Sequence, residues 1–443
     1  MIRSLYSLAM RCVQPFLRRK LKRRGVAEPG YLQHIDERFG VYDDRAEPAW
    51  PSDGGPIWIH AVSLGETRAA AILLDQLRLL QPGMRVLLTH GTATGRADGE
   101  RLLQPGDAQA WLPWDTPQAV RGFLRHFRPR LGVLMETEVW PNLAAGCAAQ
   151  GVPLVLANAR LSRKSMRQAL WLAPLSRPAY GSLAATWAQT EDDARRLARV
   201  GASVKGVFGN LKFDADPRPQ QLASGREWRQ QSGRPVLMFA SSREGEEAAL
   251  FQVLKQRREQ APAAGAQGST GVAREAQWLV VPRHPQRFDE VAALAAQHGF
   301  SVSRRSAWQG SPQPADIWIG DSIGEMALYY GLADAALLGG SFEQLGGQNL
   351  IEAAAGGCPV VMGPHTFNFA DAALLAREAG AALRVESIGD AVRTALALVA
   401  DRPRHRQVQA AALAFAAAHR GAARRTAGAL LELAGGSQAP RSD

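Results

Sequence analysis

Residues 57–66 read Ile57-Trp58-Ile59-His60-Ala61-Val62-Ser63-Leu64-Gly65-Glu66. The stretch joins a short apolar run to a Ser-x-Gly turn and a carboxylate, and a pattern rich in Ala and Leu follows it from about Thr67 to Leu80. A continuous apolar run of this length predicts a strand buried on both faces, and the pattern after it predicts a helix. The stretch is therefore typical of one strand–turn–helix repeat of a parallel sheet.

The same alternation recurs along the chain in two series. The first series continues with apolar runs at 86–89, 131–135, 152–156 and 184–188, and the second has runs at 236–240, 278–281, 317–319, 335–338 and 359–362. We therefore predict an α/β protein with two doubly wound, Rossmann-like domains that face a cleft, the GT-B glycosyltransferase fold. Some periplasmic binding proteins and certain epimerases share this architecture, so the fold leaves the function open.

The length of 443 residues also predicts two domains rather than one core. We expect an N-terminal membrane-anchor segment at 1–25 and an N-terminal Rossmann-like domain at 26–214. Pro, Gln, Arg and Gly dominate residues 215–235, which we interpret as the linker. We predict a C-terminal Rossmann-like domain at 236–434 and a disordered tail at 435–443.

The positive charge is concentrated at the N-terminus. The formal net charge is +11, and eight Lys and Arg residues precede the first acidic residue, Glu28, which leaves +3 for the rest. Proteins that bind nucleic acid usually carry a basic stripe across a folded domain. The distribution therefore argues against nucleic acid as a partner and favours an anionic membrane surface, where each basic residue contributes about 1 kcal/mol.

The N-terminal apolar segment is short. Ser4–Met10 and Cys12–Leu17 are separated by Arg11, and a helix needs about 20 apolar residues to cross a bilayer. No small-residue cleavage site follows, which argues against a signal peptide. We predict an in-plane or shallow membrane anchor with the body on the cytoplasmic side; the alternative is an amphipathic helix packed on the protein.

The cysteines and the missing motifs argue against a metal centre. Cys12, Cys147 and Cys358 are odd in number and far apart, which is typical of a reducing compartment and gives no metal-site spacing. The sequence has no Walker A loop, no H-E-x-x-H and no Asp-x-Asp after a strand. We therefore expect no metal cofactor, and cations and backbone dipoles opposite any nucleotide phosphate.

Polar residues follow the apolar runs of the first half, where ligands bind in such sheets. Glu66 opens a helix, so it is either a helix cap or a general base. Glu136 and Glu138 follow the run at 131–135. They are either a helix cap with an adjacent acidic residue or a pair of reactive groups. Lys212 could balance a phosphate or a carboxylate, or could simply be solvated.

The second half carries a pattern suited to a nucleotide. Pro282 and Arg283 follow one strand, and the segment 320–326 follows another. Gly340 and Ser341 follow a third, before a Gly-Gly-Gln-Asn stretch that begins at Gly346. We expect these glycines to present backbone N–H groups, and a helix N-terminus, to a phosphate. Glu352, one turn into that helix, would accept hydrogen bonds from a ribose.

Eight ordered motifs resemble the 3-deoxy-D-manno-octulosonic acid (Kdo) transferase family along nearly the whole chain. They are His60–Glu66, Met135–Asn142, Asn158–Ser162, Gly209–Asp214, Val281–Phe288, Gly320–Met326, Gly339–Glu352 and Gly363–Phe369. The resemblance implies a membrane-anchored GT-B enzyme at the cytoplasmic face of the bacterial inner membrane. It implies an inverting transfer of Kdo from CMP-Kdo to a lipid A precursor, lipid IVA, in lipopolysaccharide inner-core synthesis.

The resemblance also implies roles for individual residues. The N-terminal domain would bind the acceptor, with Glu66 as general base and with Glu136 and Lys212 near the reacting centre. The C-terminal domain would bind CMP-Kdo through Pro282, Arg283, Ile323, Gly324, Glu325, Asn349, Leu350, Ile351 and Glu352. The chain departs from the family at Gln348, where His is common, and Gln cannot become a cation.

Two other functions compete with this interpretation. A GT-B glycosyltransferase that uses a UDP- or GDP-sugar would have similar nucleotide motifs, and only the stretches around Glu136 and Lys212 argue against it. A non-catalytic nucleotide- or lipid-binding protein at the membrane would tolerate the loss of Glu66.

Overall fold

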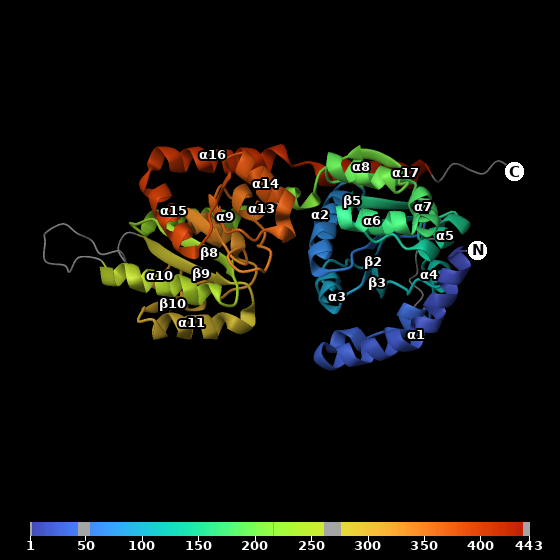
Figure 1. Ribbon diagram of the computed structural model, residues 1–443, viewed down its shortest axis with the longest axis horizontal. Coiled ribbons are helices and arrows are strands. Elements are labelled where there is room, and N and C mark those ends of the chain that lie inside the picture. Colours follow the sequence, from blue (N-terminus) through green and yellow to red (C-terminus); the bar gives the residue numbers. More distant parts are fainter. Residues whose placement is uncertain (1, 43–53, 216, 261–275, 437–443) are drawn as a thin grey trace. The chain divides into compact units, whose positions relative to one another are not determined.

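The computed structural model describes residues 2–42, 54–215, 217–260 and 276–436 (Figure 1). The chain divides into two compact units. The first comprises residues 1–214 together with 420–443, and the second comprises residues 215–419.

The first unit is built on a parallel sheet of seven strands. Its elements are α1 (Ile2–Ala27), η1 (Pro29–Leu32), η2 (Ile35–Phe39), β1 (Ile57–His60), α2 (Leu64–Leu80), β2 (Val86–His90), α3 (Ala93–Glu100), β3 (Ala108–Trp111), α4 (Pro117–Phe127), β4 (Leu131–Met135), α5 (Pro141–Ala149), β5 (Leu154–Ala159), α6 (Arg163–Trp171), α7 (Ala173–Gly181), β6 (Ala185–Ala188), α8 (Glu191–Arg199), β7 (Val204–Val207), η4 (Leu211–Asp214) and α17 (Ala422–Gly436). The strand order is β3-β2-β1-β4-β5-β6-β7.

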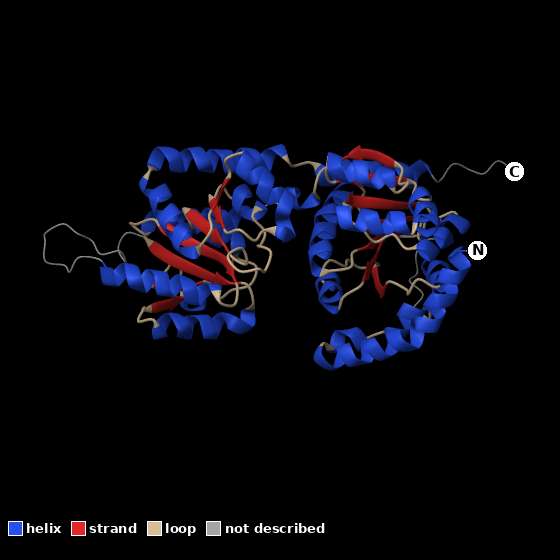
Figure 2. Ribbon diagram, viewed as in Figure 1, coloured by secondary structure: helices blue, strands red, loops and turns tan. Residues whose placement is uncertain are grey.

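Both faces of this sheet are covered, which explains its continuous apolar strands. In β1, Ile57 and Ile59 belong to a core that includes α2 and α17. Trp58 points to the other face, into a core built with α4, α5 and α8. Figure 2 shows helices on both sides of the strands in each unit.

The second unit has the same plan. Its elements are α9 (Pro219–Gln231), β8 (Val236–Ser242), α10 (Glu246–Gln260), β9 (Gln277–Pro282), η6 (Pro285–Arg287), α11 (Phe288–Gln297), β10 (Val302–Arg304), η7 (Arg305–Ala307), β11 (Ile317–Ile319), α12 (Met326–Leu332), β12 (Ala335–Leu338), α13 (Ile351–Ala355), β13 (Val360–Met362), η8 (Phe367–Phe369), α14 (Ala370–Glu378), β14 (Ala382–Arg384), α15 (Ile388–Ala400) and α16 (Arg402–Ala418). The strand order is β10-β11-β9-β8-β12-β13-β14, and all pairs are parallel.

Near the middle of each sheet the strand order reverses direction. In the first unit this point lies between β1 and β4, and in the second it lies between β8 and β12. Ligands bind at the carboxyl ends of the strands beside such a point. The loops after these four strands are therefore where side chains of functional interest are expected in each unit.

The structure corrects two predicted domain boundaries. Residues 219–231 of the proposed linker form helix α9, which packs on α12 within the second unit. The proposed C-terminal domain ends too late, because α17 belongs to the first unit. Apolar residues of α17, including Ala423 and Leu430, are buried against α2, and Asp214 accepts hydrogen bonds from Gly421 N and Ala423 N at its start.

The N-terminal segment is one helix, α1, that packs on the first unit by one face. Tyr6 Oη donates to Asp115 Oδ2 at 2.9 Å, and Ser7 Oγ donates to Asn142 Oδ1 at 2.9 Å. The guanidinium of Arg24 lies over the ring of Tyr31. Among the described residues, no helix combines the length and the apolar character that a membrane crossing needs. Of the predicted tail, residues 437–443 lie outside the described part of the chain.

Candidate active site

Glu66 lies at the start of α2, directly after β1. Ser63 is the N-cap of this helix, and its Oγ accepts from Glu66 N. The Glu66 carboxylate reaches back and accepts from Val62 N at 2.8 Å and from Ser63 Oγ at 3.2 Å. This reciprocal arrangement resembles a capping box, but the backbone donor is Val62 N, one residue before the N-cap. The hydrogen bonds support the capping interpretation of Glu66, and they fix the carboxylate at the carboxyl edge of the sheet.

The surroundings of Glu66 make it a weaker acid than usual. Burial raises the pKa of Glu66 to about 7, and the nearby charges of Glu136 and Glu138 act in the same direction. The two hydrogen bonds oppose this shift without cancelling it. A carboxyl group with a pKa near 7 can both take up and release a proton at neutral pH, which is the property that a general base requires.

Glu136 follows β4 and holds two cations. Its Oε2 lies 2.7 Å from Arg160 Nε, and its Oε1 lies 3.4 Å from Lys212 Nζ. The Glu136 side chain is only 5% exposed, whereas Arg160 is 54% exposed. Glu136 has a backbone φ of 61°, a left-handed conformation that costs energy for a residue with a side chain. The loop after β4 is thus strained where it presents this carboxylate.

Backbone-directed hydrogen bonds hold Lys212 next to Glu136. Asn158 is the second-last residue of β5, and its Oδ1 accepts a hydrogen bond from Leu211 N at 3.1 Å. Asn210 Oδ1 accepts from Lys212 N at 3.0 Å, and Asn210 Nδ2 donates to Gln189 Oε1. The loops after β5, β6 and β7 are therefore tied to one another, and they bring two predicted site residues, Glu136 and Lys212, into contact.

The histidines near this edge have a structural role. His60, at the end of β1, is fully buried, and its Nδ1 contacts Thr89 Oγ1 at 2.9 Å. Burial lowers the pKa of His60 to about 3 and that of His90 to about 4. Both imidazoles are therefore neutral in the folded protein, and neither supplies a cation to the site.

In the second unit, Arg283 and Gln348 are joined across two loops. Arg283 follows β9, and its Nε donates to Gln348 Oε1 at 3.2 Å. Its backbone N donates to Ser242 O at the end of β8. The glutamine that departs from the family pattern therefore accepts from a cation, which a protonated histidine could not do.

The glycine-rich loop after β12 is arranged differently from our expectation. Gly340 N donates to Glu246 Oε2, and Gly347 N donates to Gly340 O. Phe342 N also donates to Glu246. These backbone donors are occupied inside the protein, so they do not form the expected phosphate cradle. The following helix, α13, has only five residues, which limits its dipole.

Three residues predicted to bind the nucleotide have buried side chains. Ser341 Oγ donates to Leu338 O and accepts from Gly363 N at 2.8 Å. Leu350 and Ile351 are buried in the core, with 1% and 0% exposure. Any contact of these three residues with a ligand would use backbone atoms. Asn349 and Glu352 are partly exposed, and Asn349 Nδ2 donates a hydrogen bond to Glu352 Oε1 at 3.1 Å.

The loop after β11 is the outer part of the predicted nucleotide site. Glu325 pairs with Arg305 at 2.9 Å, and Ser322 Oγ also donates to Glu325. Ile323 is 77% exposed, and Gly324 has a φ of 81°. Pro282, at the end of β9, is buried. Apart from Arg305, which follows β10, these residues lie at the carboxyl ends of β9 and β11, two adjacent strands of the sheet.

Sequence reasoning missed Arg243 and Glu246, whereas it expected Arg160 as a basic side chain at the same edge as Lys212 without giving it a role. Arg160 and Glu136 follow neighbouring strands, which explains why they meet. Residues 243–247 follow β8, so the rule that singled out Glu66 also applied to them. Glu246 is fully buried and accepts from Arg243 N as well as from Gly340 N and Phe342 N. Gly340 and Phe342 lie 94 and 96 positions after Glu246 in the sequence, and no local pattern predicts contacts at such separations.

Within the described residues, no group of three or more His, Cys, Asp or Glu side chains is placed to hold a metal ion.

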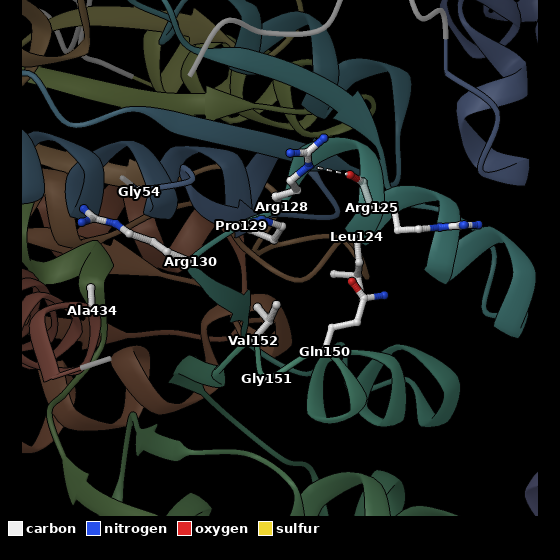
Figure 3. Close-up of a pocket in the computed structure, with 10 residues that line it drawn as sticks. All are labelled: Gly54, Leu124, Arg125, Arg128, Pro129, Arg130, Gln150, Gly151, Val152 and Ala434. Carbon is white, nitrogen blue, oxygen red and sulfur yellow. Dashed lines mark hydrogen bonds between the residues drawn. The ribbon is translucent and has the colours of Figure 1, made fainter. Parts of the chain in front are cut away.

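A pocket of about 480 Å³ lies elsewhere in the first unit, beside the amino ends of β1, β4 and β5. Figure 3 shows its three arginines, Arg125, Arg128 and Arg130, pointing in different directions. They do not converge on one position, so they do not form a single anion site.

The sequence comparisons point to one family. The model of the family described as 3-deoxy-D-manno-octulosonic-acid transferase (kdotransferase) matches residues 33–215. The chain is 46% identical to the 3-deoxy-D-manno-octulosonic acid transferase of Bordetella pertussis, over 97% of this chain and 98% of that protein. It is 31% identical to the enzyme of the same name from Haemophilus influenzae, over 89% of this chain and 90% of that protein.

Among solved structures, the chain is similar to a glycosyltransferase from Rickettsia africae. The TM-score is 0.53 at 13% sequence identity, with 85% of this chain and 98% of that chain covered. This likeness concerns the fold alone, and it agrees with the predicted GT-B fold built from two Rossmann-like units.

Proposed function

The chain belongs to the Kdo transferase family, and we propose that this glycosyltransferase moves Kdo from CMP-Kdo onto a lipid A precursor, lipid IVA, in lipopolysaccharide inner-core synthesis. The observation that carries the proposal is the similarity to named Kdo transferases along almost the whole chain. The rival donors, UDP- and GDP-sugars, have no comparable support.

Glu66 is the general base in this proposal. Its carboxylate takes the proton from an acceptor hydroxyl as that oxygen forms a bond to the anomeric carbon of Kdo. The bond between this carbon and the phosphate oxygen breaks, and CMP leaves with the electron pair. A single displacement of this kind inverts the configuration and forms no sugar–enzyme bond. The pKa of about 7 supports the role, because a base of that strength is half ionised at neutral pH.

Glu136 and Lys212 stabilise the charges of the reacting groups in this proposal. Glu136 is held between Arg160 and Lys212, so the cluster carries more positive than negative charge. The donor has a phosphate and a carboxylate, and a cationic surrounding favours both. The donor itself is assigned to the second unit, with Arg283, Glu325, Asn349 and Glu352 supplying polar side chains and Pro282, Ile323, Gly324, Gly340, Ser341, Leu350 and Ile351 supplying backbone and packing contacts. We propose no metal cofactor.

We also propose that α1 rests on the cytoplasmic face of the inner membrane. The face of α1 that does not pack on the protein exposes apolar side chains, including Leu5 at 64% and Phe16 at 69%. Basic residues continue the helix from Arg18 to Arg24, where they would meet anionic lipid headgroups. An acceptor that lies in the membrane would explain such a helix on this enzyme.

A transfer assay tests the reaction. CMP-Kdo generated in situ is incubated with a tetraacylated lipid A precursor and EDTA, using the native chain, Glu66→Ala and the control Glu100→Ala, which changes an exposed carboxylate of α3. We expect product from the native chain and the control, and a loss of about 10²–10⁴-fold for Glu66→Ala. Absence of product from folded native protein, with transfer from a UDP- or GDP-sugar instead, would overturn the donor assignment. Full activity of Glu66→Ala would remove Glu66 as the base.

Vesicle sedimentation tests the membrane proposal. The double variant Leu5→Asp/Phe16→Asp should bind vesicles containing phosphatidylglycerol more weakly than the native chain. Leu79→Asp changes an equally exposed apolar residue of α2, 72% exposed, and should bind like the native chain. Equal binding by all three proteins would show that α1 does not carry the membrane contact.

A further inference from the structure

The segment 241–247, which runs from the end of β8 through a short loop into the first turn of α10, lies beside the point where the second sheet reverses its strand order. The loop after β12 lies on the other side of that point, and it contains Gly340. The two loops touch through their backbones, because a Cβ added to Gly339 would lie 2.2 Å from Ser241 O. The position is the one at which doubly wound sheets bind their ligands.

The backbone of this loop is irregular where it leaves the sheet. The pairing of β8 with β9 shifts register between Ala240 and Ser242. Ser241 has a φ of 55°, a conformation that residues with side chains seldom adopt. Bulges and strain of this kind occur beside active sites, where they redirect a side chain. The residue that follows the irregularity is Arg243.

Arg243 lies next to Gly340, at the same edge of the sheet as the cation Arg283. The Cγ of Arg243 lies 3.6 Å from the position that a Cβ of Gly340 would occupy, and Gln348 Nε2 lies 3.2 Å from it. Burial lowers the pKa of His284, and the charges of Arg243 and Arg283 lower it further. Both guanidinium groups therefore lie near His284. The Arg243 side chain is 24% exposed, and its Nε lies 3.0 Å from Glu244 Oε2.

Glu246 fixes the backbone on both sides of this position. Its Oε2 accepts from Arg243 N at 2.9 Å and from Gly340 N at 2.8 Å, and its Oε1 accepts from Phe342 N at 3.1 Å. The side chain is fully buried. Because these three N–H groups are occupied, they are not available to an anion beside Gly340, and a nearby side-chain cation would be the group that neutralises it.

We propose that Arg243 binds an anionic group of the sugar-nucleotide donor, and that Glu246 is the positioning residue that holds Arg243 beside Gly340. The inference rests on the proposed function, which supplies a donor with two anionic groups, a phosphate and a sugar carboxylate. A guanidinium suits either group, because it can donate two parallel hydrogen bonds to two oxygens.

Calorimetric binding of CMP and of cytidine, together with the Michaelis constant for CMP-Kdo, tests the role of Arg243. The variants are Arg243→Gln, Arg243→Lys and the control Arg393→Gln, which removes the same charge from an exposed ion pair of α15. If Arg243 binds the phosphate, CMP should bind Arg243→Gln about 10- to 100-fold more weakly while cytidine binds unchanged. If it binds the carboxylate, CMP affinity stays and the donor KM rises by a similar factor. Arg243→Lys should recover part of the loss.

Unchanged CMP affinity and unchanged donor KM in Arg243→Gln would overturn the inference. Failure of the native chain to use CMP-Kdo is a different result, because it overturns the proposed function and is read from the native protein alone.

The positioning role of Glu246 is tested by a double-mutant cycle. Glu246→Gln keeps the size of the side chain but places an NH₂ group against backbone donors. If Glu246 acts through Arg243, the double variant Arg243→Gln/Glu246→Gln should bind CMP no more weakly than the worse single variant. The same comparison applies to the donor KM if that is the quantity that Arg243→Gln changes. Additive losses, or a Glu246→Gln variant in which the quantity changed by Arg243→Gln keeps its native value, would show that Glu246 does not act through Arg243. Thermal unfolding of each variant separates this effect from loss of the fold.

Discussion

Glu66 and Glu246 stand at corresponding places in the two units. Each lies in the first turn of the helix that follows the strand next to the reversal point of its sheet. Each also accepts a hydrogen bond from a backbone N–H three or four residues earlier, Arg243 N for Glu246 and Val62 N for Glu66. The two positions differ in what else the carboxylate binds.

Glu246 is fully buried, and its further partners are backbone groups of a second loop. Glu66 is partly exposed, and its further partner is a hydroxyl of its own turn. Both oxygens of each carboxylate accept a hydrogen bond, but only Glu246 is enclosed by backbone donors and shielded from solvent. A carboxylate held in that way organises the structure, whereas a partly exposed one can exchange a proton. The comparison teaches that the same residue at the same place in a fold takes its role from its exposure and from the groups that donate to it.

The largest expected effect distinguishes Glu66 from Glu246 by the constant that changes, which is kcat for Glu66 and the Kd for CMP for Glu246. Glu66→Gln keeps the hydrogen bond from Val62 N but cannot take up a proton. We expect kcat to fall by about 10²–10⁴-fold with the Kd for CMP unchanged within about twofold. Initial rates and calorimetry measure both values. A rise in the Kd for CMP instead of a fall in kcat would make Glu66 resemble Glu246 and would break the comparison.

The pH dependence of kcat/KM should report the ionisation of Glu66. The base acts as a carboxylate, so activity is lost as the pH falls through the pKa of about 7. Between pH 7 and pH 5 we expect a decrease of about 50-fold, which approaches tenfold per pH unit below the pKa. A profile that is flat over this range would mean that Glu66 ionises at an ordinary pKa or is not the base.

Stability should change in the opposite sense to activity. Because the pKa of Glu66 is raised in the folded state, its contribution to stability is present below about pH 4.5 and is lost as the pH rises through about 7. Glu66→Gln should therefore be more stable than the native chain at pH 8, on the order of 1–2 kcal/mol given its partial exposure, and equal to it at pH 4. Thermal unfolding at the two pH values measures the difference, and equal stability at pH 8 would contradict it.

The smallest effect concerns the influence of Glu136 on Glu66. The negative charge of Glu136 raises the pKa of Glu66, and Glu136 also neutralises Arg160 and Lys212. Glu136→Gln should shift the midpoint of the pH–rate profile to lower pH, whatever it does to the maximal rate. Glu100→Gln, on the exposed face of α3, should leave the midpoint in place. A shift to higher pH would show that Glu136 does not act on Glu66 by charge.

The central strands could be predicted because burial on both faces demands continuous apolar residues. The runs at 57–60 and 131–135 coincide with β1 and β4. The edge strands were missed: β7 alternates half-buried and exposed residues, and β10 has no buried residue. The polar composition of residues 219–231 predicts a linker, but these residues form helix α9, in which Gly225 packs directly on the backbone of α12.

The candidate site was predictable to the extent that it follows strand order. The sequence placed Glu136 and Lys212 at one edge, and the structure brings them within 3.4 Å. It could not show that Gly340 N is occupied by Glu246, because that bond depends on how two distant loops pack. Gly340 N and Phe342 N therefore do not contribute to the expected phosphate cradle, and sequence reasoning did not reach Arg243, which lies beside them.

The return of α17 to the first unit has a consequence for synthesis of the chain. Residues 422–436 cover the apolar face of α2, yet a ribosome makes them more than three hundred residues after α2 itself. The first unit therefore waits for the whole second unit to be translated before its surface is closed. A fragment that ends at His419 should bind an apolar fluorescent dye that the full chain excludes, and it offers a holding chaperone the surface that the last helix later covers.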